Sequence, residues 1–390
     1  MKKSQPNNNK RVAIIGTVGV PAKYGGFETL AHHLVEQLAD KTDMTVYCSA
    51  KNYSKEERKE TYKGAKLKYL PLSANGASSV LYDIISMIHA LIFADVMIVL
   101  GVSGALFLPF VKLFSTKKVI VNVDGLEWRR AKWQGWAKKF LEISERIAVT
   151  VSDEIITDNE AIQKYVFDRY GLNSRLIEYG ADHTSYVPLT NEIVEKYPFL
   201  AGDYAFKVCR IEPENNIKEV LVAFQNYEKM PLVMVGNWNH SAYSRSVYNE
   251  FKDVPNLFFL QPIYDSYLLN ALRSNCKVYV HGHSAGGTNP SLVEAMHLGL
   301  PIIAFDVIYN RITMEHHGRF FENASDLQAQ LAAISNAELF QLARTMESIA
   351  RRRYTWSVIA NKYFEAVIST KPQPAPVFDF ELPLALRSAF

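Results

Sequence analysis

One stretch indicates the fold of this chain most directly: His281-Gly-His-Ser-Ala-Gly-Gly-Thr-Asn-Pro-Ser-Leu-Val-Glu294-Ala-Met. It follows a short run, 277–280, typical of a buried parallel strand, and helical spacing begins near Ser291. Glycines let a ligand approach the backbone, and the first turn of a helix leaves N–H groups that can bind it. The order of strand, glycine-rich turn and helix therefore predicts an α/β fold with a site for a phosphate.

A purely structural interpretation of the same residues is open. Ser291-x-x-Glu294 matches a capping box, and Asn289-Pro290 matches an N-cap followed by proline at the first helical position. Capping requires neither the glycine pair 286–287 nor the two histidines before it. These additional residues favour a ligand site.

Length and composition favour a folded chain with two domains. A chain of 390 residues exceeds the usual size of one core. A hydrophobic content of 48% with 21% charged residues excludes general disorder, and a net charge of +3 gives no indication of a nucleic-acid partner. Cys48, Cys209 and Cys276 have no metal-ligand spacing, so we expect buried thiols in a reducing compartment.

Secretory and membrane-spanning segments are not expected. Residues 1–10 are polar and basic, which is typical of a disordered tail rather than a signal peptide. The most apolar region, 80–114, is interrupted by charged residues such as Asp83 and Asp95, which are costly in lipid. A helix, a strand and a second helix within an α/β domain explain this region better.

The N-terminal part has its own strand, glycine loop and helix. The run 11–16 is a short apolar strand, the loop 17–27 contains Gly25 and Gly26, and helical spacing begins at Glu28. Many nicotinamide dehydrogenases begin in the same way, but their fingerprint G-x-G-x-x-G is absent. That alternative is therefore weakened.

Strands and helices alternate along the rest of the chain, which predicts two doubly wound parallel sheets. We expect a disordered tail at 1–10, domains at 11–185 and 186–370, and a tail at 371–390, because the periodicity lapses at 182–199. One helical pattern spans 337–368, and this closing helix could pack back on the first domain. The default active site is the cleft between the domains.

Four motifs resemble those of GT4-family glycosyltransferases with the GT-B fold. They are Gly19-Val-Pro-Ala-Lys-Tyr-Gly-Gly-Phe-Glu28, Asn122-Val-Asp-Gly-Leu-Glu-Trp128, Arg210-Ile-Glu-Pro-Glu-Asn-Asn216 and Gly286-Gly-Thr-Asn-Pro-Ser291. Within that family the chain is similar to bacterial rhamnosyltransferases with a DUF1972-type N-terminal domain, which use dTDP-rhamnose. The resemblance implies two Rossmann-like domains facing a central cleft, the first on the acceptor side and the second binding the nucleotide sugar.

The resemblance also implies which residues bind the donor. Arg210 would bind the diphosphate, and Glu294 would accept hydrogen bonds from the ribose. A surface salt bridge from Arg210 to Glu212 or Glu214 is the structural alternative. The remaining donor-binding residues are Gly25, Gly26, Asn215, Asn216, Gly287, Thr288, Asn289 and Ser291.

The chain departs from the family pattern at two positions. Many members have two acids separated by seven residues, but the position of the first acid is Gly286. Asn215-Asn216 stand where a diphosphate-binding lysine is expected. A single carboxylate, Glu294, is compatible with a deoxyribose, which has one hydroxyl fewer.

Asp124 and Glu127 follow an apolar strand at its carboxyl end, where side chains face a ligand. We nominate Asp124 as general base or orienting group for the acceptor hydroxyl, with Glu127 as second candidate. A simple turn at Asp124-Gly125 is the alternative. Because members of this family generally retain anomeric configuration, with the donor phosphate accepting the acceptor's proton, Asp124 would then orient rather than deprotonate.

The segment after Glu127 mixes tryptophans with basic residues, which suits a membrane interface. A solvated basic helix face with tryptophans packed inward is the alternative. The predicted contacts with membrane or acceptor are Trp128, Arg129, Arg130, Lys132 and Trp133.

The sequence thus predicts a cytoplasmic glycosyltransferase, peripheral at the inner face of the cell membrane. It would move L-rhamnose from dTDP-rhamnose to a polyprenyl-diphosphate-linked saccharide in cell-surface polysaccharide assembly, with neither cofactor nor metal and with no nucleic-acid partner. The alternatives are a transferase using a UDP-hexose, a GT-B-shaped epimerase, and an inactive nucleotide-sugar-binding subunit. The histidines at 281, 283, 316 and 317 have no metal-site spacing.

Overall fold

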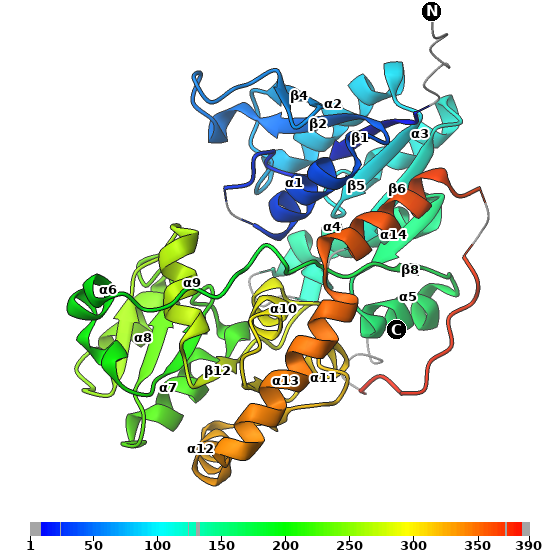
Figure 1. The fold of residues 1–390 in the computed structure, drawn as a ribbon. Helices are drawn as coiled ribbons and strands as arrows, with labels where there is room; N and C mark the ends of the chain where they lie inside the picture. Colours follow the sequence, from blue (N-terminus) through cyan, green and yellow to red (C-terminus); the bar gives the residue numbers. More distant parts are fainter. Residues whose placement is uncertain (1–8, 24, 124, 130–132, 371–372, 384–390) are drawn as a thin grey trace, which may run out of the picture. The chain divides into compact units, whose positions relative to one another are not determined.

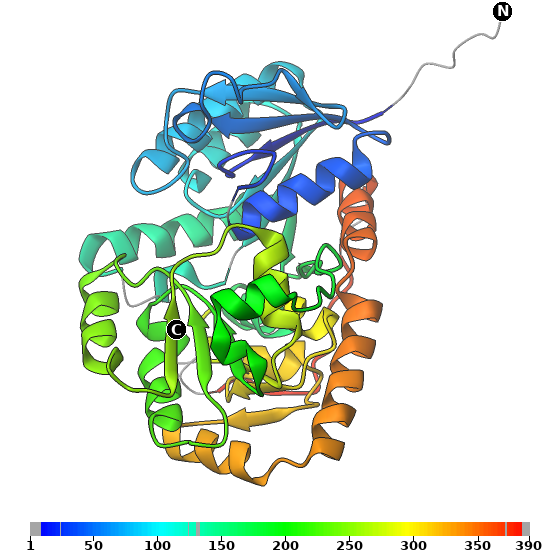
Figure 2. The same ribbon diagram turned by 60° about the vertical axis from the view of Figure 1, so that its left-hand side comes forward.

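The computed structural model describes residues 9–23, 25–123, 125–129, 133–370 and 373–383. The chain divides into two compact units, 1–178 with 356–390, and 179–355. Each unit is an α/β sheet layered with helices (Figures 1 and 2). The α/β class with two doubly wound sheets is therefore confirmed.

The first unit contains an eight-stranded sheet with the order β3-β4-β2-β1-β5-β6-β7-β8. Its strands run parallel, except that β3 pairs antiparallel with β4. The strands are β1 (Arg11–Ile15), β2 (Asp43–Ser49), β3 (Thr61–Tyr62), β4 (Ala65–Leu70), β5 (Val96–Leu100), β6 (Lys118–Val123), β7 (Glu154–Thr157) and β8 (Arg175–Leu176). The helices are α1 (Gly26–Leu38), α2 (Ser78–Phe93), α3 (Leu108–Phe114), α4 (Gly135–Val151), α5 (Glu160–Tyr170) and α14 (Trp356–Ile368), with short 3-10 turns η1 (Ala50–Asn52), η2 (Ala105–Phe107) and η3 (Glu127–Arg129).

The second unit contains a six-stranded parallel sheet with the order β11-β10-β9-β12-β13-β14. The strands are β9 (Ala205–Val208), β10 (Leu232–Val235), β11 (Leu257–Leu260), β12 (Val278–His281), β13 (Ile302–Phe305) and β14 (Arg319–Phe321). The helices are α6 (Asn191–Lys196), α7 (Ile217–Gln225), α8 (Ala242–Phe251), α9 (Ser266–Ser274), α10 (Pro290–His297), α11 (Ile308–Thr313), α12 (Ala324–Ala333) and α13 (Asn336–Arg353), with 3-10 turns η4 (Pro198–Ala201) and η5 (Pro213–Asn215).

Strand composition explains the two sheets. The central strands are short runs of β-branched and other apolar residues, and every residue of β5 and β12 is buried. Strands buried on both faces require helices on both sides, which the crossover connections between parallel strands provide.

The strand order places the expected ligand sites. In the first sheet the order reverses between β1 and β5, and in the second between β9 and β12. Ligands of such sheets bind beyond the carboxyl ends of the strands at these switch points. The loops after β1, β9 and β12 contain three of the four motifs quoted above.

The C-terminal helical pattern differs from its prediction. The single helix expected at 337–368 is two helices, because α13 ends at Arg353 and α14 begins at Trp356. The second of them packs against α1, far away in sequence (Figures 1 and 2). It belongs to the first unit, whose boundary falls after residue 178 rather than 185.

Candidate active site

In the first unit, the loop after β1 folds around one carboxylate. Glu28 Oε1 accepts a hydrogen bond from the Val18 N–H at 2.8 Å. Gly25, with φ of 123°, is the N-cap of α1, and a Cβ atom there would collide with the Glu28 carboxylate. Only glycine fits this position. Glycine at this position thus lets the loop close on the Glu28 carboxylate at the start of α1.

In the second unit, the loops after β9 and β12 are joined by hydrogen bonds. Asn215 contacts His283 Nδ1 through Oδ1 at 2.9 Å, and its Nδ2 donates to the Arg210 carbonyl at 2.8 Å. Asn216 Nδ2 donates to the Gly282 carbonyl at 2.8 Å. Both asparagines therefore hold the two loops together, which is a structural role rather than the direct donor contact that the resemblance implies.

The start of α10 is capped by Asn289. Its Oδ1 accepts hydrogen bonds from the Ser291 N–H at 3.0 Å and the Ser291 hydroxyl at 2.8 Å, and Pro290 is the first helical residue. The predicted N-cap and proline are confirmed. The capping box between Ser291 and Glu294 is wrong, because the Glu294 carboxylate is bound by other groups. Gly287 and Thr288 lie in the turn before the cap, and Thr288 is buried.

Glu294 lies between Arg273 and His183, two partners that the sequence did not indicate. One carboxylate oxygen forms a short ion pair with Arg273 Nη1, and the other is 3.2 Å from His183 Nε2. Burial alone raises the pKa of this carboxyl, but Arg273 and His183 outweigh burial and lower the pKa to about 2. Glu294 is therefore ionised and fixed in orientation.

Two cations lie near the joined loops. Arg210 is exposed and forms no ion pair with any described residue, so the predicted alternative of a bridge to Glu212 or Glu214 is not formed. Lys207 is only 2% exposed, and no carboxylate in the described parts of the chain pairs with it. A Cβ atom at Gly282 would lie 2.7 Å from Lys207 Nζ, so this ammonium group sits against the Gly282 backbone.

Burial lowers the pKa of Lys207, because a desolvated ammonium is disfavoured. Burial also lowers the pKa of His281 well below its ordinary value, with the Lys207 and His283 charges acting in the same direction. Within the described residues, His281 Nε2 has no hydrogen-bonding partner. Positive charge therefore lies at the carboxyl ends of β9 and β12. Among the described residues, no carboxylate neutralises Lys207.

The predicted acceptor-side residues have mixed outcomes. Asp124, Arg130 and Lys132 lie outside the described residues. Glu127 Oε1 accepts a hydrogen bond from Trp133 Nε1 at 3.0 Å, so these two residues hold each other.

Trp128 does not fit an exposed membrane contact. It is 6% exposed, and its indole N–H donates to Glu145 at 2.9 Å. The Arg129 guanidinium lies 5.0 Å from the centre of its ring. The interpretation of Trp128 as an interfacial ring is therefore wrong, because the carboxylate inside the unit satisfies its polar atom.

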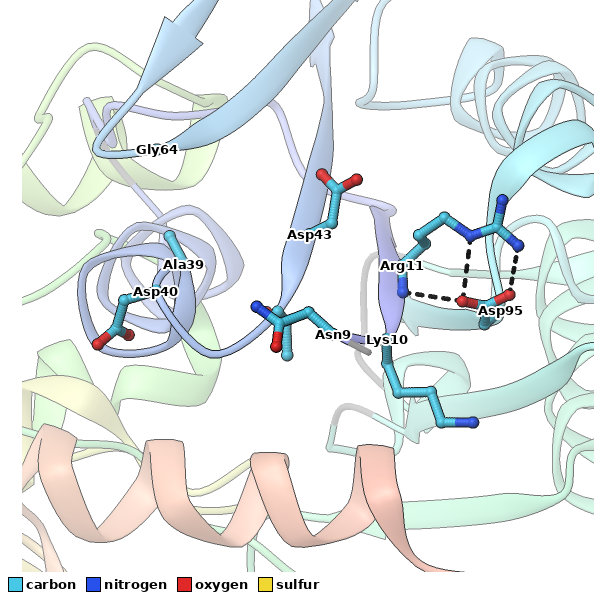
Figure 3. A pocket seen from close by; sticks show the side chains of 9 residues that line it. Asn9, Lys10, Arg11, Ala39, Asp40, Asp43, Gly64 and Asp95 are labelled. Atoms are coloured by element: carbon cyan, nitrogen blue, oxygen red, sulfur yellow. Dashed lines mark hydrogen bonds and ion pairs between the residues drawn. The ribbon is translucent and has the colours of Figure 1, made fainter. Parts of the chain in front are cut away.

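An open hollow of about 820 Å³ lies at the opposite edge of the first sheet. It is lined by residues at the amino ends of β1 and β2, including Arg11, which binds Asp95 through three hydrogen bonds (Figure 3). Arg11 holds the pKa of Asp95 at about 2. Because ligands bind at the carboxyl ends of parallel strands, we do not assign this hollow to the active site.

The described residues include one group with metal-ligand spacing, His32, His33 and Glu36 on α1. Glu36 lies 3.0 Å from His33 Nδ1 and 3.5 Å from His32 Nε2, so the group is joined internally. Lys63 Nζ is 3.9 Å from the same carboxylate, and its charge opposes binding of a cation. We assign no metal to this group.

Sequence reasoning did not identify His183, Arg273 or Lys207. Lys207 gave a usable signal, because a lysine inside an apolar strand is rarely buried without a reason. The sequence contained no comparable signal for Arg273 and His183, because their shared partner Glu294 is distant in sequence from both.

Comparisons with known proteins agree with this geometry. Residues 9–182 match the family model Domain of unknown function (DUF1972), and residues 191–353 match Glycosyl transferases group 1. No curated protein shows significant sequence similarity to the chain.

Three solved structures illustrate the shared fold. Sucrose-phosphate synthase from Thermosynechococcus elongatus is 15% identical, with a TM-score of 0.77 over 92% of this chain and 98% of that one. Anabaena Alr3699/HepE, solved with UDP, is 13% identical, with a TM-score of 0.70 over 92% and 99%. A glycosyltransferase from Rickettsia africae is 10% identical, with a TM-score of 0.69 over 93% and 100%.

The family matches and the fold agree on one class of protein. Both units have the parallel α/β sheets of GT-B glycosyltransferases. Residues 191–353 match the family model Glycosyl transferases group 1, and together with the GT-B fold this match supports a GT4-type glycosyltransferase.

Proposed function

We propose that the protein transfers L-rhamnose from dTDP-rhamnose to a polyprenyl-diphosphate-linked saccharide in cell-surface polysaccharide assembly. It would work at the inner face of the cell membrane, without a metal and with retention of configuration. The observation that carries the donor site is the pair of joined loops at the switch point between β9 and β12, with Arg210 and Lys207 beside them. The rhamnosyl donor and lipid acceptor rest on the motif resemblance.

The leaving diphosphate requires positive charge as the glycosidic bond breaks. Arg210 can bind phosphate oxygens in a bidentate manner, and its guanidinium is unpaired among the described residues. Lys207 on strand β9 would supply a second positive charge. It would replace the diphosphate-binding lysine expected where this chain has Asn215. Backbone N–H groups at the start of α10 complete the set.

The nucleotide ribose would bind at Glu294. A carboxylate has about four acceptor positions, so the contacts to Arg273 and His183 leave acceptor positions for hydroxyls of the nucleotide. A deoxyribose offers one hydroxyl fewer than a ribose, which is compatible with the glycine at position 286.

The transfer requires no side chain as a base, because the leaving phosphate can accept the proton. The bond from sugar C1 to the diphosphate oxygen breaks, C1 bonds to the acceptor oxygen, and the acceptor's proton moves to the leaving dTDP phosphate. Asp124, just beyond β6, would orient the acceptor hydroxyl, with Glu127 as the second candidate. The loss of Asp124 should therefore reduce transfer less than the loss of Arg210.

A UDP-hexose donor is the second candidate. Structures of Anabaena Alr3699/HepE, with the same fold, contain UDP, UDP with glucose, and UDP-glucose. Fold alone does not determine the sugar, so the donors must be compared directly. An inactive binding subunit is the third alternative.

Mass spectrometry of a synthetic polyprenyl-diphosphate-GlcNAc acceptor tests the proposal. The protein is incubated with EDTA and either dTDP-L-rhamnose, UDP-glucose or UDP-GlcNAc. We expect a gain of one deoxyhexose with the first donor only, greatly reduced in Arg210→Ala and unchanged in Arg351→Ala, an exposed arginine of α13. A hexose gain would reassign the donor, and binding of donor without any transfer would indicate an inactive subunit.

A further inference from the structure

Helix α2 exposes a row of apolar side chains in addition to the Tyr82, Met87 and Ala90 side chains that it buries. Ile92 is 79% exposed, and the exposed side chains recur at every third or fourth residue, so they form one stripe along the helix. The stripe consists of Leu81, Ile85, Ile88 and Ile92. The opposite face buries Asp83 and Ser86. Packing within the unit does not account for a stripe of this kind.

The stripe continues on the neighbouring helices. Right-handed crossovers put α2, α3 and α4 on the same face of the sheet, and α3 contacts both of the others. On α3, Leu113 and Phe114 are 74% and 76% exposed, with Phe110 beside them. Trp136, in the first turn of α4, is 80% exposed. We call the seven aliphatic and phenyl side chains of α2 and α3, together with Trp136, the apolar face.

Basic residues lie at the start of α4, next to Trp136. The only acidic residue in α2 and α3 is Asp83, which is buried. Lys138 and Lys139 follow Trp136 and are exposed, and Lys139 also pairs with Glu142 at 3.0 Å. Apolar side chains next to a tryptophan and lysines suit the boundary between headgroups and acyl chains of an anionic bilayer.

The contact would be peripheral. Among the described helices, none combines the length and apolar character needed to cross a bilayer. Helix α2 has 16 residues, fewer than the roughly 20 that a spanning helix requires. Lying flat on a membrane, it would bury its exposed stripe while its opposite face stayed packed in the unit.

We propose that the apolar face docks on an anionic membrane surface, with α2 and α3 lying in the headgroup region. This deepens the proposed function, on which its purpose rests, because a lipid-linked acceptor must be reached from the membrane surface. It also moves the membrane contact from the buried Trp128 to α2, α3 and Trp136.

Vesicle flotation tests the docking without reference to catalysis. The full chain is mixed with vesicles of phosphatidylcholine, with or without about one-third phosphatidylglycerol. We expect binding to the anionic vesicles, weakened about tenfold or more in the variant Ile92→Ser/Leu113→Ser/Phe114→Ser. The matched control, Phe340→Ser/Val377→Ser, removes exposed apolar groups elsewhere and should bind as wild type.

Further measurements separate the possible outcomes. Lys138→Gln/Lys139→Gln should reduce the preference for anionic vesicles. Equal flotation of the triple variant and wild type, with unchanged thermal unfolding, overturns the proposal. A wild-type dimer in light scattering that the triple variant converts to monomer, without vesicle binding, would instead assign the face to a second copy.

Transfer to a short-chain, water-soluble acceptor distinguishes the docking from the chemistry. The triple variant should keep the wild-type rate on that acceptor and lose it on the vesicle-bound one. If neither protein transfers sugar to any acceptor, the proposed function fails, while flotation still decides whether the apolar face docks.

Discussion

Lys207 is buried beside the Gly282 backbone without a carboxylate partner among the described residues, so its charge is unfavourable until an anion binds. Lys207→Met should weaken dTDP binding about ten- to one-hundred-fold, measured by calorimetry, because a charge-assisted contact is lost. The same change should leave unfolding stability equal or higher, because an unpaired buried charge is removed. Lys277→Met, half-exposed and paired with Asp203, is the control. Unchanged dTDP affinity would exclude Lys207 from the site.

Unlike Lys207, the buried guanidinium of Arg273 has a carboxylate partner, Glu294. Glu294→Gln should destabilise the protein by about 3 kcal/mol, since Arg273 loses its partner. The exposed pair of Glu347 and Arg351 is the control, and Glu347→Gln should cost less than about 0.5 kcal/mol. Urea unfolding measures both changes, and equal effects would contradict this account.

The same pair predicts how the free energy of unfolding changes with pH. The Glu294 pKa of about 2 lies below its ordinary value of 4.5, so the unfolded chain takes up the proton first. The stabilisation is present above about pH 4.5 and is lost as the pH falls toward 2. Periodicity could place Glu294 on a helix, but it could not identify Arg273, because contacts between distant residues leave no mark in local spacing.

At the scale of elements, α2 holds a carboxyl in its buried face. Burial raises the pKa of Asp83 to about 8, although the Gly104 N–H acts against it. The native state therefore keeps a proton that the unfolded chain releases, so stability should fall as pH rises from about 4 to 8, by up to about 1.4 kcal/mol per unit. Asp83→Asn should flatten this slope in urea unfolding, and exposed Asp253→Asn should not. A slope that survives in Asp83→Asn would place its source elsewhere.

Elements with a strong local pattern were predictable, and the apolar run 11–16 is strand β1. The short strand β7 was not predicted, because its four residues carry too little pattern. The break between α13 and α14 was missed for a different reason. The apolar spacing continues through Tyr354, although α13 belongs to the second unit and α14 to the first. The spacing of apolar residues does not indicate which unit a helix packs against.

At the scale of the whole molecule, α14 completes the first unit. Its Tyr363 hydroxyl accepts a hydrogen bond from Asn122 at 2.6 Å, and its last turn accepts two from Lys118 Nζ. Tyr363→Ala should therefore lower the unfolding temperature of the first unit by several degrees, since it removes a large buried side chain. Calorimetry with dTDP identifies the unfolding transition of the second unit, because the bound ligand raises its unfolding temperature. That increase should persist in Tyr363→Ala. Exposed Ile368→Ser is the control, and loss of the dTDP shift would contradict this division.

The return of α14 to the first unit has a consequence for synthesis. Residues 1–178 leave the ribosome long before residues 356–368, yet the two segments form one compact unit. The second unit is contiguous and can finish folding while its neighbour still waits for its last helix. The second unit can therefore complete its fold before the first, and the α1 face of the nascent first unit stays uncovered until α14 has been synthesised.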